Sequence, residues 1–593
     1  MFSVARPFAH RFQVRWSLAL LLVLGSGLAP RATADDDIAP IRLVSDAAAV
    51  CVEVPHFEQT WSRLQQSRLL ARLKEFPPVQ RFLAGSGFQK WNQMQDHVRQ
   101  ATGKSLSDHL LGAYSESIVL AVYLPDGKPP EGVLIGQARD AATLKQGLQT
   151  WAKLDPQHEL KSKEHLGQAY IRRAKSANSA EVIYYAVLGR TIALSDQESQ
   201  IQRVIELHAA ASRPVASSDA KLLAELPLFR VNRARQPQDA AAFLFLNARV
   251  WDKVVDVELR KSPEGKWIQS ILQQVAAVTA AVRLDDEVVL DVAADLQGAP
   301  LAPVWRQFAA GASSDGDWNQ RIPAEAIAVI SSRMDIGPLI QAWLTLNPDA
   351  RTEEFLRGRN VLKSLLLGRD LFTDVLPNAL RDWSVSLLPA EAAVSESSPV
   401  DLLGQISLNG AQRSTDASLD RSLDNALQFG MNAFSVMLSH QRAASADPVL
   451  VKSESSAAGI ERTMTGLKAW APSYKISPQQ LLLATSAQGL TRGQGVTDST
   501  RTESRLAAHE RRYFQATSQL VWLDAVRLRG ILARHSNWIA GQLEPDSTAG
   551  RERVLQHLSK LSEATNVFDA AFLAVKFDED SVRIVLGASL DRE

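Results

Sequence analysis

The chain has 593 residues, of which 46% are hydrophobic and 22% charged, a balance typical of globular proteins with sizeable cores. Its 65 basic residues equal its 65 acidic ones, which excludes nucleic acid as a bulk electrostatic partner. The single cysteine excludes an intrachain disulfide, so the fold must be stabilised by the burial of apolar side chains.

The N-terminal segment has the features of a secretory signal peptide. Arginines precede the apolar run WSLALLLVLGSGLA at residues 16–29, and Ala32 and Ala34 form an A-x-A motif before three aspartates. We predict that residues 1–34 are cleaved off after Ala34, which leaves 61 basic and 65 acidic residues and a protein in the periplasm or outside the cell. The alternative is a retained anchor, although the run is shorter than the ~20 residues that span a bilayer. We expect no membrane span after cleavage.

The first motif of the mature chain is an apolar strand, AAAVCVEV, which contains the lone Cys51. We interpret Cys51 as a small buried side chain of a core strand, the alternatives being a reactive thiol or an intermolecular disulfide. Further on, LAGSGFQ at residues 83–89 contains Gly-Ser-Gly but not the G-x-S-x-G of a nucleophile elbow. This segment indicates a turn between two helices.

Gly103-Lys104-Ser105, in QATGKSLSDHLLG, resembles the end of a nucleotide-binding phosphate loop. Such a loop needs a glycine where this chain has Val98, and it follows a buried strand, whereas the residues before Gly103 are polar and helix-like. The sequence instead predicts that one helix ends at Gly103 and that Ser105 caps the next. Asp108 then lies in the first turn of that helix, where an acidic side chain is favourable.

Periodicity and turn residues predict further elements along the chain. These are amphipathic helices at residues 142–154 and 419–434, a hairpin at 182–195 and a second hairpin signal at 402–411.

Two features offer metal-binding atoms. His158 and His165 are the closest pair of histidines, but they lack a zinc-binding spacing and we interpret them as solvated side chains. The acidic clusters at residues 285–287 and 578–580 carry the oxygen ligands that Ca²⁺ prefers. Each lies between two strand-like runs without the spacing of an EF-hand, so we interpret both as charged hairpin turns. We predict no metal and no cofactor.

Two arginine-rich segments, FRVNRARQ at residues 229–236 and HERRYF at 509–514, each precede a predicted strand. Arginine suits the binding of an acidic glycan or another anionic envelope polymer. The alternative is a solvated connector. The candidate polyanion contacts are Arg230, Arg233, Arg235, Arg511 and Arg512.

Four segments of the first half resemble four segments of the second half, in the same order. The pairs are 47–64 with 325–346, 103–125 with 368–389, 240–255 with 517–532, and 280–296 with 573–590. Four matches in one order indicate a tandem duplication.

We therefore predict a first domain at residues 38–298, a linker rich in Gly, Pro, Ser and Asp at 299–320, and a second domain at 321–593. The strands occur in hairpin-like pairs rather than in strict alternation with helices. Each copy should thus have an α+β fold, a largely antiparallel sheet with helices packed on one side.

GRDLFTDVLPNALRDWSVSLLP, at residues 368–389, resembles a recurring segment of a family of large exported bacterial proteins that is classified only as a domain of unknown function. The opening strand and the LDAVRL segment are similar as well. The first copy departs from the pattern, because Ser105 and Gly112 replace Asp370 and Pro377. The resemblance implies export and a duplicated α+β fold, and it implies no activity and no site residues.

No complete catalytic motif occurs in the sequence, so we predict no catalytic residue. We expect an exported, non-enzymatic protein that binds or scaffolds an unknown protein or polymer of the cell envelope. The alternative is an exported hydrolase whose active-site residues are dispersed along the chain.

Overall fold

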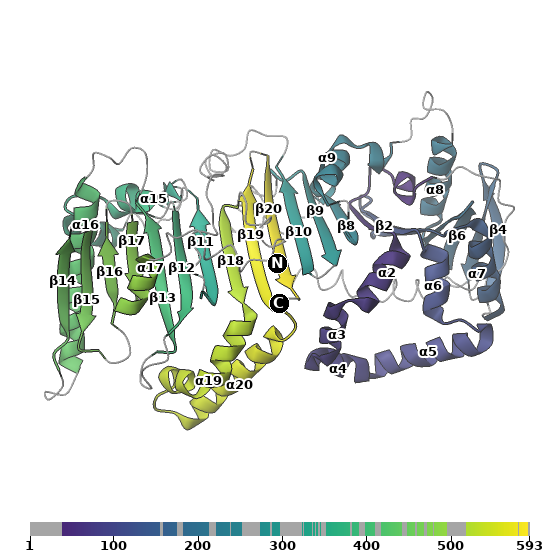
Figure 1. Ribbon diagram of the computed structural model, residues 1–593. Coiled ribbons are helices and arrows are strands. Elements are labelled where there is room, and N and C mark those ends of the chain that lie inside the picture. The colour runs from purple at the N-terminus through teal and green to yellow at the C-terminus, as the bar shows by residue number, and fades with distance from the viewer. Residues whose placement is uncertain are drawn as a thin grey trace. The chain divides into compact units, whose positions relative to one another are not determined.

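Figure 1 shows the fold of the chain in a computed structural model. It describes residues 38–154, 158–174, 182–212, 221–237, 239–251, 273–284, 287–296, 323, 325–334, 336–337, 340–341, 344, 352–379, 382–390, 398–408, 417–441, 447–456, 459–467, 471–477, 480–494, 517–578 and 580–590. The predicted signal peptide, with Ala32 and Ala34, and the predicted linker at 299–320 lie outside these residues. The chain divides into two compact units, Met1–Gly298 and Ala299–Glu593.

The first unit is built on an antiparallel sheet with the strand order β4-β5-β6-β7-β3-β2-β1-β8-β9-β10. Its strands are β1 (Val50–Pro55), β2 (Ser117–Tyr123), β3 (Glu131–Gln137), β4 (Glu159–His165), β5 (Gln168–Ala174), β6 (Val182–Leu188), β7 (Thr191–Ser195), β8 (Ala242–Asn247), β9 (Ala277–Leu284) and β10 (Glu287–Asp295). Its helices are η1 (Pro40–Leu43), α2 (Phe57–Gln66), α3 (Arg68–Glu75), α4 (Pro77–Ala84), α5 (Ser86–Thr102), α6 (Leu106–Tyr114), α7 (Ala141–Leu154), α8 (Glu198–Ala211), η2 (Leu223–Glu225) and α9 (Pro227–Arg235).

Several local predictions for this unit are confirmed. The hairpin at 182–195 is β6 and β7, and its turn contains Gly189 with φ of 61°, in the left-handed region that glycine adopts without strain. The helix at 142–154 is α7, and the Gly-Ser-Gly segment is the break between α4 and α5 at Gly85.

Helices cover both faces of the first sheet, so the prediction of helices on one side is wrong. Ile135 of β3 packs in a core with Ile201 of α8, whereas its neighbour Leu134 packs in a second core with Leu144 of α7. Because adjacent strand residues point to opposite faces, a strand covered on both sides needs an unbroken apolar run. The sequence GVLIG of β3 has this property, and its residues are buried throughout.

The second unit is also an antiparallel sheet, with the strand order β14-β15-β16-β17-β13-β12-β11-β18-β19-β20. Its strands are β11 (Ala328–Arg333), β12 (Asp382–Pro389), β13 (Val400–Ser407), β14 (Leu450–Ser456), β15 (Gly459–Thr465), β16 (Ser473–Ile476), β17 (Gln480–Ala484), β18 (Gln519–Asp524), β19 (Ala570–Phe577) and β20 (Ser581–Ser589). Its helices are α14 (Glu353–Leu365), the π-helix η5 (Leu371–Val375), α15 (Leu376–Ala379), α16 (Ala417–Gln441), α17 (Ala487–Gln494), α19 (Ala525–Leu543) and α20 (Thr548–Thr565).

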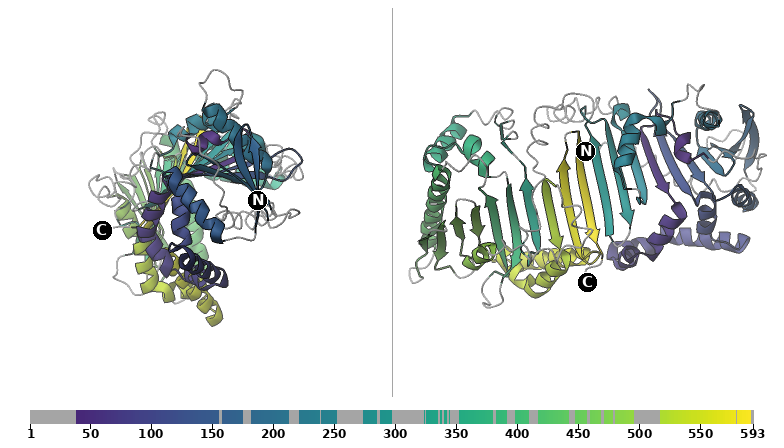
Figure 2. Two further views of the ribbon diagram at one scale, coloured as in Figure 1. Left: turned by 90° about the vertical axis from the view of Figure 1, so that its right-hand side faces the viewer. Right: turned by 45° about the horizontal axis from the view of Figure 1, so that its top comes forward.

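Helices lie on both faces of this sheet too. Leu481 of β17 packs in a core with Leu423 of α16. Helix α16 contains the helix predicted at 419–434 and continues beyond it at both ends. Ala484, three residues further along β17 and on the opposite face, lies beside Gly489 of α17. Helices α19 and α20 pack side by side, as both views in Figure 2 show.

The two units share one topology when β1 corresponds to β11, β2 to β12, and so on to β20. Their hydrogen-bond registers agree as well: Val50 pairs with Val122 and Leu246 in the first unit, and Ala328 pairs with Leu387 and Leu523 in the second. These equivalent residues are also the ones that the sequence matches align. Sequence and hydrogen bonding therefore give the same correspondence between the units.

Candidate functional site

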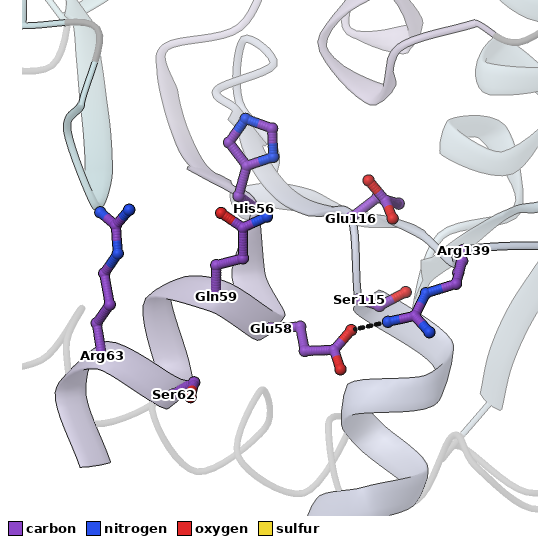
Figure 3. Close-up of a pocket in the computed structure, with 8 residues that line it drawn as sticks. All are labelled: His56, Glu58, Gln59, Ser62, Arg63, Ser115, Glu116 and Arg139. Carbon is purple, nitrogen blue, oxygen red and sulfur yellow. Dashed lines mark hydrogen bonds and ion pairs between the residues drawn. The ribbon is translucent and has the colours of Figure 1, made fainter. Parts of the chain in front are cut away.

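A polar hollow of about 440 Å³ lies in the first unit, where three segments of the chain meet (Figure 3). The segments are the junction of β1 and α2, the junction of α6 and β2, and the residues after β3. The lining side chains are all polar or charged: His56, Glu58, Gln59, Ser62, Arg63, Ser115, Glu116 and Arg139. The volume lies within the range of ligand pockets in proteins.

His56 holds the turn between β1 and α2 in an uncommon conformation. Its φ of 50° and ψ of 51° place a residue other than glycine in the left-handed region, which costs of order 1–3 kcal/mol. The turn is held by the carbonyl of His56, which accepts a hydrogen bond from the backbone N–H of Thr60 at 2.9 Å. The imidazole is exposed and does not cap the helix, so it is available at the rim of the hollow.

Backbone hydrogen bonds join the second segment to the sheet and to α2. The N–H of Glu58 donates to the carbonyl of Ser115 at 3.0 Å, and the N–H of Glu116 donates to the carbonyl of Gln137 at 3.0 Å. These bonds hold the backbone of Ser115 and Glu116 at the edge of the hollow. Ser115 is only 6% exposed, and its Oγ is buried without a hydrogen-bond partner among the described residues.

One ion pair crosses the hollow. Nη2 of Arg139 donates to Oε2 of Glu58 at 2.7 Å (Figure 3), with 67% and 47% of the two side chains exposed. An exposed pair of this kind adds little to stability. Its main effect here is that Arg139 and Glu58 neutralise each other.

Five of the lining side chains have no partner in the part of the chain that the structure describes. They are His56, Gln59, Arg63, Ser115 and Glu116. This group contains one guanidinium, one carboxylate and three hydrogen-bonding side chains. Such a set can bind a polar molecule through both charges and through hydrogen bonds.

The two serines of the hollow are not paired with a base in the described structure. The hydroxyl group of Ser62 accepts a hydrogen bond from Nε2 of Gln66 at 3.3 Å rather than donating to a base. Neither Ser62 nor Ser115 is hydrogen-bonded to His56 in the described structure, so the nucleophile–base contact of acyl-transfer enzymes is not formed there.

The second unit has a different chemistry at the equivalent positions. By the register of β1 and β11, Met334 corresponds to His56, Ile336 to Glu58 and Gln341 to Arg63. Met334 is buried. The charges of Glu58 and Arg63 are thus not repeated at the equivalent positions of the second unit.

The predicted polyanion contacts lie elsewhere. Arg230, Arg233 and Arg235 are on α9, and Arg511 and Arg512 lie outside the described residues. Nε of Arg233 is 3.2 Å from Oε2 of Glu53, and its guanidinium lies 4.9 Å from the ring centre of Phe243. Arg230 and Arg233 line a second hollow of about 510 Å³. Polyanion binding by these arginines stays a prediction.

The histidines considered for metal binding have separate partners. Nε2 of His165 lies 2.9 Å from Oε1 of Glu206, and Nδ1 of His158 lies 3.2 Å from Nη2 of Arg173. Of the acidic clusters, Glu287 is a buried residue at the start of β10, which pairs with β9, and Asp578 and Asp580 lie between the paired strands β19 and β20. Asp285, Asp286 and Glu579 lie outside the described residues, so the interpretation of the clusters as charged turns stays a prediction. Among the residues described, no three His, Cys, Asp or Glu side chains gather as metal ligands.

Cys51 is fully buried in β1, as predicted, and desolvation strongly raises the pKa of its thiol. The break-and-cap interpretation of Gly103-Lys104-Ser105 is confirmed too. Gly103 ends α5 with φ of 78°, and Ser105 and Asp108 form a capping box at the start of α6. In the second unit Gly368, with φ of 92°, precedes Asp370, which caps η5.

The sequence did not point to the hollow around His56. Its eight residues come from positions 56–63, 115–116 and 139, and none of these segments carries a recognised motif. Only the fold brings them together. Within the described part of the chain, no helix combines the length and apolar character needed to cross a membrane.

No family model matches the chain, and no curated protein matches it either. Membership of the exported family inferred from residues 368–389 therefore stays a prediction. Among solved structures, chains of TP0453, a Treponema protein, in crystal forms III, I and IV match part of the chain, at identities of 12%, 12% and 11%. The TM-scores are 0.24, 0.23 and 0.22, and the matches cover 45%, 45% and 44% of this chain and 83%, 83% and 81% of the others. A likeness this distant carries no argument about function.

Proposed function

We propose that the protein is an exported, non-enzymatic binding protein that takes a small polar molecule into the hollow of its first unit. One observation carries this proposal. Five side chains, among them one guanidinium and one carboxylate, surround a volume of about 440 Å³ and have no partner among the described residues. A buried polar group without a partner, such as the hydroxyl of Ser115, requires an explanation, and in a concave site a few polar groups orient a bound ligand.

Buried Ser115 supports the same conclusion. A buried hydroxyl without a partner costs free energy, and a ligand or an ordered water that reaches it removes that cost. At this hollow the described residues give the hydrolase alternative no comparable support, because neither Ser62 nor Ser115 is hydrogen-bonded to His56.

The test is a thermal-shift and calorimetric screen of the mature chain, residues 35–593, against small polar solutes. Binding that Ser115→Ala and Glu116→Gln weaken at least tenfold is expected, whereas Glu75→Gln, an exposed change on α3, should leave it unaltered. Turnover of an ester or peptide that is lost in Ser115→Ala and in a His56→Ala variant would establish the hydrolase instead.

The proposal of export rests on the N-terminal sequence pattern. Expression of the full chain in a bacterium, followed by N-terminal sequencing of the protein from the periplasmic fraction, should give Asp35 as the first residue. A full-length chain retained in the membrane fraction would favour the anchor.

We also propose that the two units descend from one duplicated unit. Four ordered sequence matches and an identical strand order and register support this history. Superposition of the two units in an experimental structure should align Cys51 with Val329 and Phe245 with Trp522. A different register there would disprove common descent.

A further inference from the structure

We propose that the ligand of the hollow is a zwitterion, either a free amino acid or a short peptide with both termini free. The inference rests on the proposed binding function and specifies the chemistry of that same site. It follows from the charges that remain after the internal ion pair has formed.

The hollow contains two arginines and two glutamates, and only one of each is already engaged. Arg139 and Glu58 are paired at 2.7 Å. Arg63 and Glu116 have no ionic or hydrogen-bond partner among the described residues. A ligand that satisfies both must bring one negative and one positive group.

The two free charges are separated across the hollow. In Figure 3, Arg63 and Glu116 lie on opposite sides of His56 and Gln59. A ligand that carried only an anion would satisfy Arg63 and leave the half-buried carboxylate of Glu116 unpaired. A molecule with its charges at its two ends fits both positions at once, and electrostatic complementarity then selects it over singly charged compounds.

The carboxylate end of the ligand belongs beside Arg63. The planar guanidinium can form two parallel hydrogen bonds to a carboxylate, and it is fully ionised at any physiological pH. The ammonium end then belongs beside Glu116, whose backbone N–H is held by the carbonyl of Gln137.

The groups between the two charges suit a peptide unit. Gln59 provides both a donor and an acceptor, and Ser115 adds a hydroxyl that can serve as either. The backbone amides of a short peptide require these two functions. The volume of about 440 Å³ leaves room for more than a single small amino acid.

The experiment measures binding to the mature chain by calorimetry with alanine, dialanine and trialanine, which vary the distance between the two charged ends. Each peptide is compared with its N-acetylated form and its C-terminal amide. We expect one length to bind best and each blocked form to bind at least tenfold more weakly.

Charge reversal tests the orientation. Arg63→Glu and Glu116→Lys should each abolish binding of the preferred peptide, and the double variant should restore it within tenfold, with the peptide reversed. Lys74→Glu with Glu75→Lys, on exposed positions of α3, is the matched control. Circular dichroism establishes that each variant is folded.

The outcomes separate the two proposals. If blocked peptides bind as tightly as free ones, the proposal of a zwitterionic ligand is wrong and the proposed binding function stands. The same holds if the double variant is folded but does not bind the preferred peptide. If neither these peptides nor any solute of the broader screen binds, both proposals fail.

Discussion

Arg462 donates two hydrogen bonds to Asp424, from Nε to Oδ1 at 2.9 Å and from Nη2 to Oδ2 at 2.8 Å. The hydroxyl of Tyr474 donates a third, to Oδ1, at 2.7 Å. The two ionic side chains are 12% and 13% exposed, and they join α16 to β15 and β16. Loss of one partner therefore leaves a poorly solvated charge beside a core.

Asp424→Asn should lower the free energy of unfolding by about 3 kcal/mol, the scale found when one partner of a largely buried pair is removed. Urea unfolding measures this change. Glu454→Gln breaks the exposed pair of Lys452 and Glu454, at 2.6 Å, and should have no measurable effect. Equal losses in both variants would show that the Asp424 pair is no more important than a surface contact.

The same pair predicts a pH dependence. Hydrogen bonds from Arg462 hold the pKa of Asp424 below its usual value. Its stabilising contribution is therefore fully present above the carboxyl pKa of the unfolded chain, about 4, and is lost as the pH falls through the lower folded value. When the pH is lowered from 7 to 2.5, the free energy of unfolding should fall further in the unsubstituted chain than in Asp424→Asn. Urea unfolding of both proteins at each pH measures this difference. Equal losses in the two proteins would show that Asp424 is not the source of the pH dependence.

Variants at the start of α6 distinguish a structural helix cap from a nucleotide-binding loop. Ser105→Ala should cost about 1 kcal/mol in stability, because Oγ of Ser105 accepts from the N–H of Asp108 at 3.1 Å. Lys104→Ala should stay within about 0.5 kcal/mol, because Lys104 is exposed. The addition of ATP should shift the melting temperature of neither variant, nor that of the unsubstituted chain. A thermal shift with ATP that disappears in Lys104→Ala would restore the phosphate-loop interpretation.

Gly136 of β3 lies directly beneath the ring of Tyr114, and an added Cβ would overlap that ring. Tyr114 is 3% exposed and packed in the core, so it has no space into which to move. Gly136→Ala should cost about 1–3 kcal/mol through overpacking. Gly87→Ala, in α5 with no atom within 4 Å of the new methyl group, should instead be neutral or stabilising. Thermal denaturation of both variants checks the contrast.

Cys51 should resist thiol reagents while the first unit is folded. Its side chain is 0% exposed, and the raised pKa of the thiol leaves almost no reactive thiolate. Labelling with iodoacetamide should proceed only in denaturant, in step with the loss of circular dichroism. Rapid labelling of the native chain would identify a local opening of β1.

Much of the local structure was predictable from the sequence. The break at Gly103, the cap at Ser105 and the hairpin around Gly189 depend on residue types with strong backbone preferences, so short windows suffice. The error about helices on one face had an available signal, because the unbroken apolar run of β3 indicates a strand that is buried on both sides.

The hollow around His56 was not predictable in the same way. Arg63 and Glu116 are far apart in the chain and neither is unusual in its own segment. Their proximity depends on the antiparallel pairing of β1 with β2, which sets α2 beside the start of β2. Arg233 shows the opposite case, since an apparent basic patch contains a side chain already paired with Glu53.

The central position of β1 has a consequence for how each unit acquires its structure. Cys51 pairs with Ala121 on one side and with Phe245 on the other, and Val329 pairs likewise with Ser386 and Trp522. The first strand of each unit must therefore wait until most of that unit has been synthesised before its second edge is covered. Contacts so distant along the chain slow folding, because a long loop must close first. During that interval the open edge of the strand can pair with another chain, which is a route to aggregation.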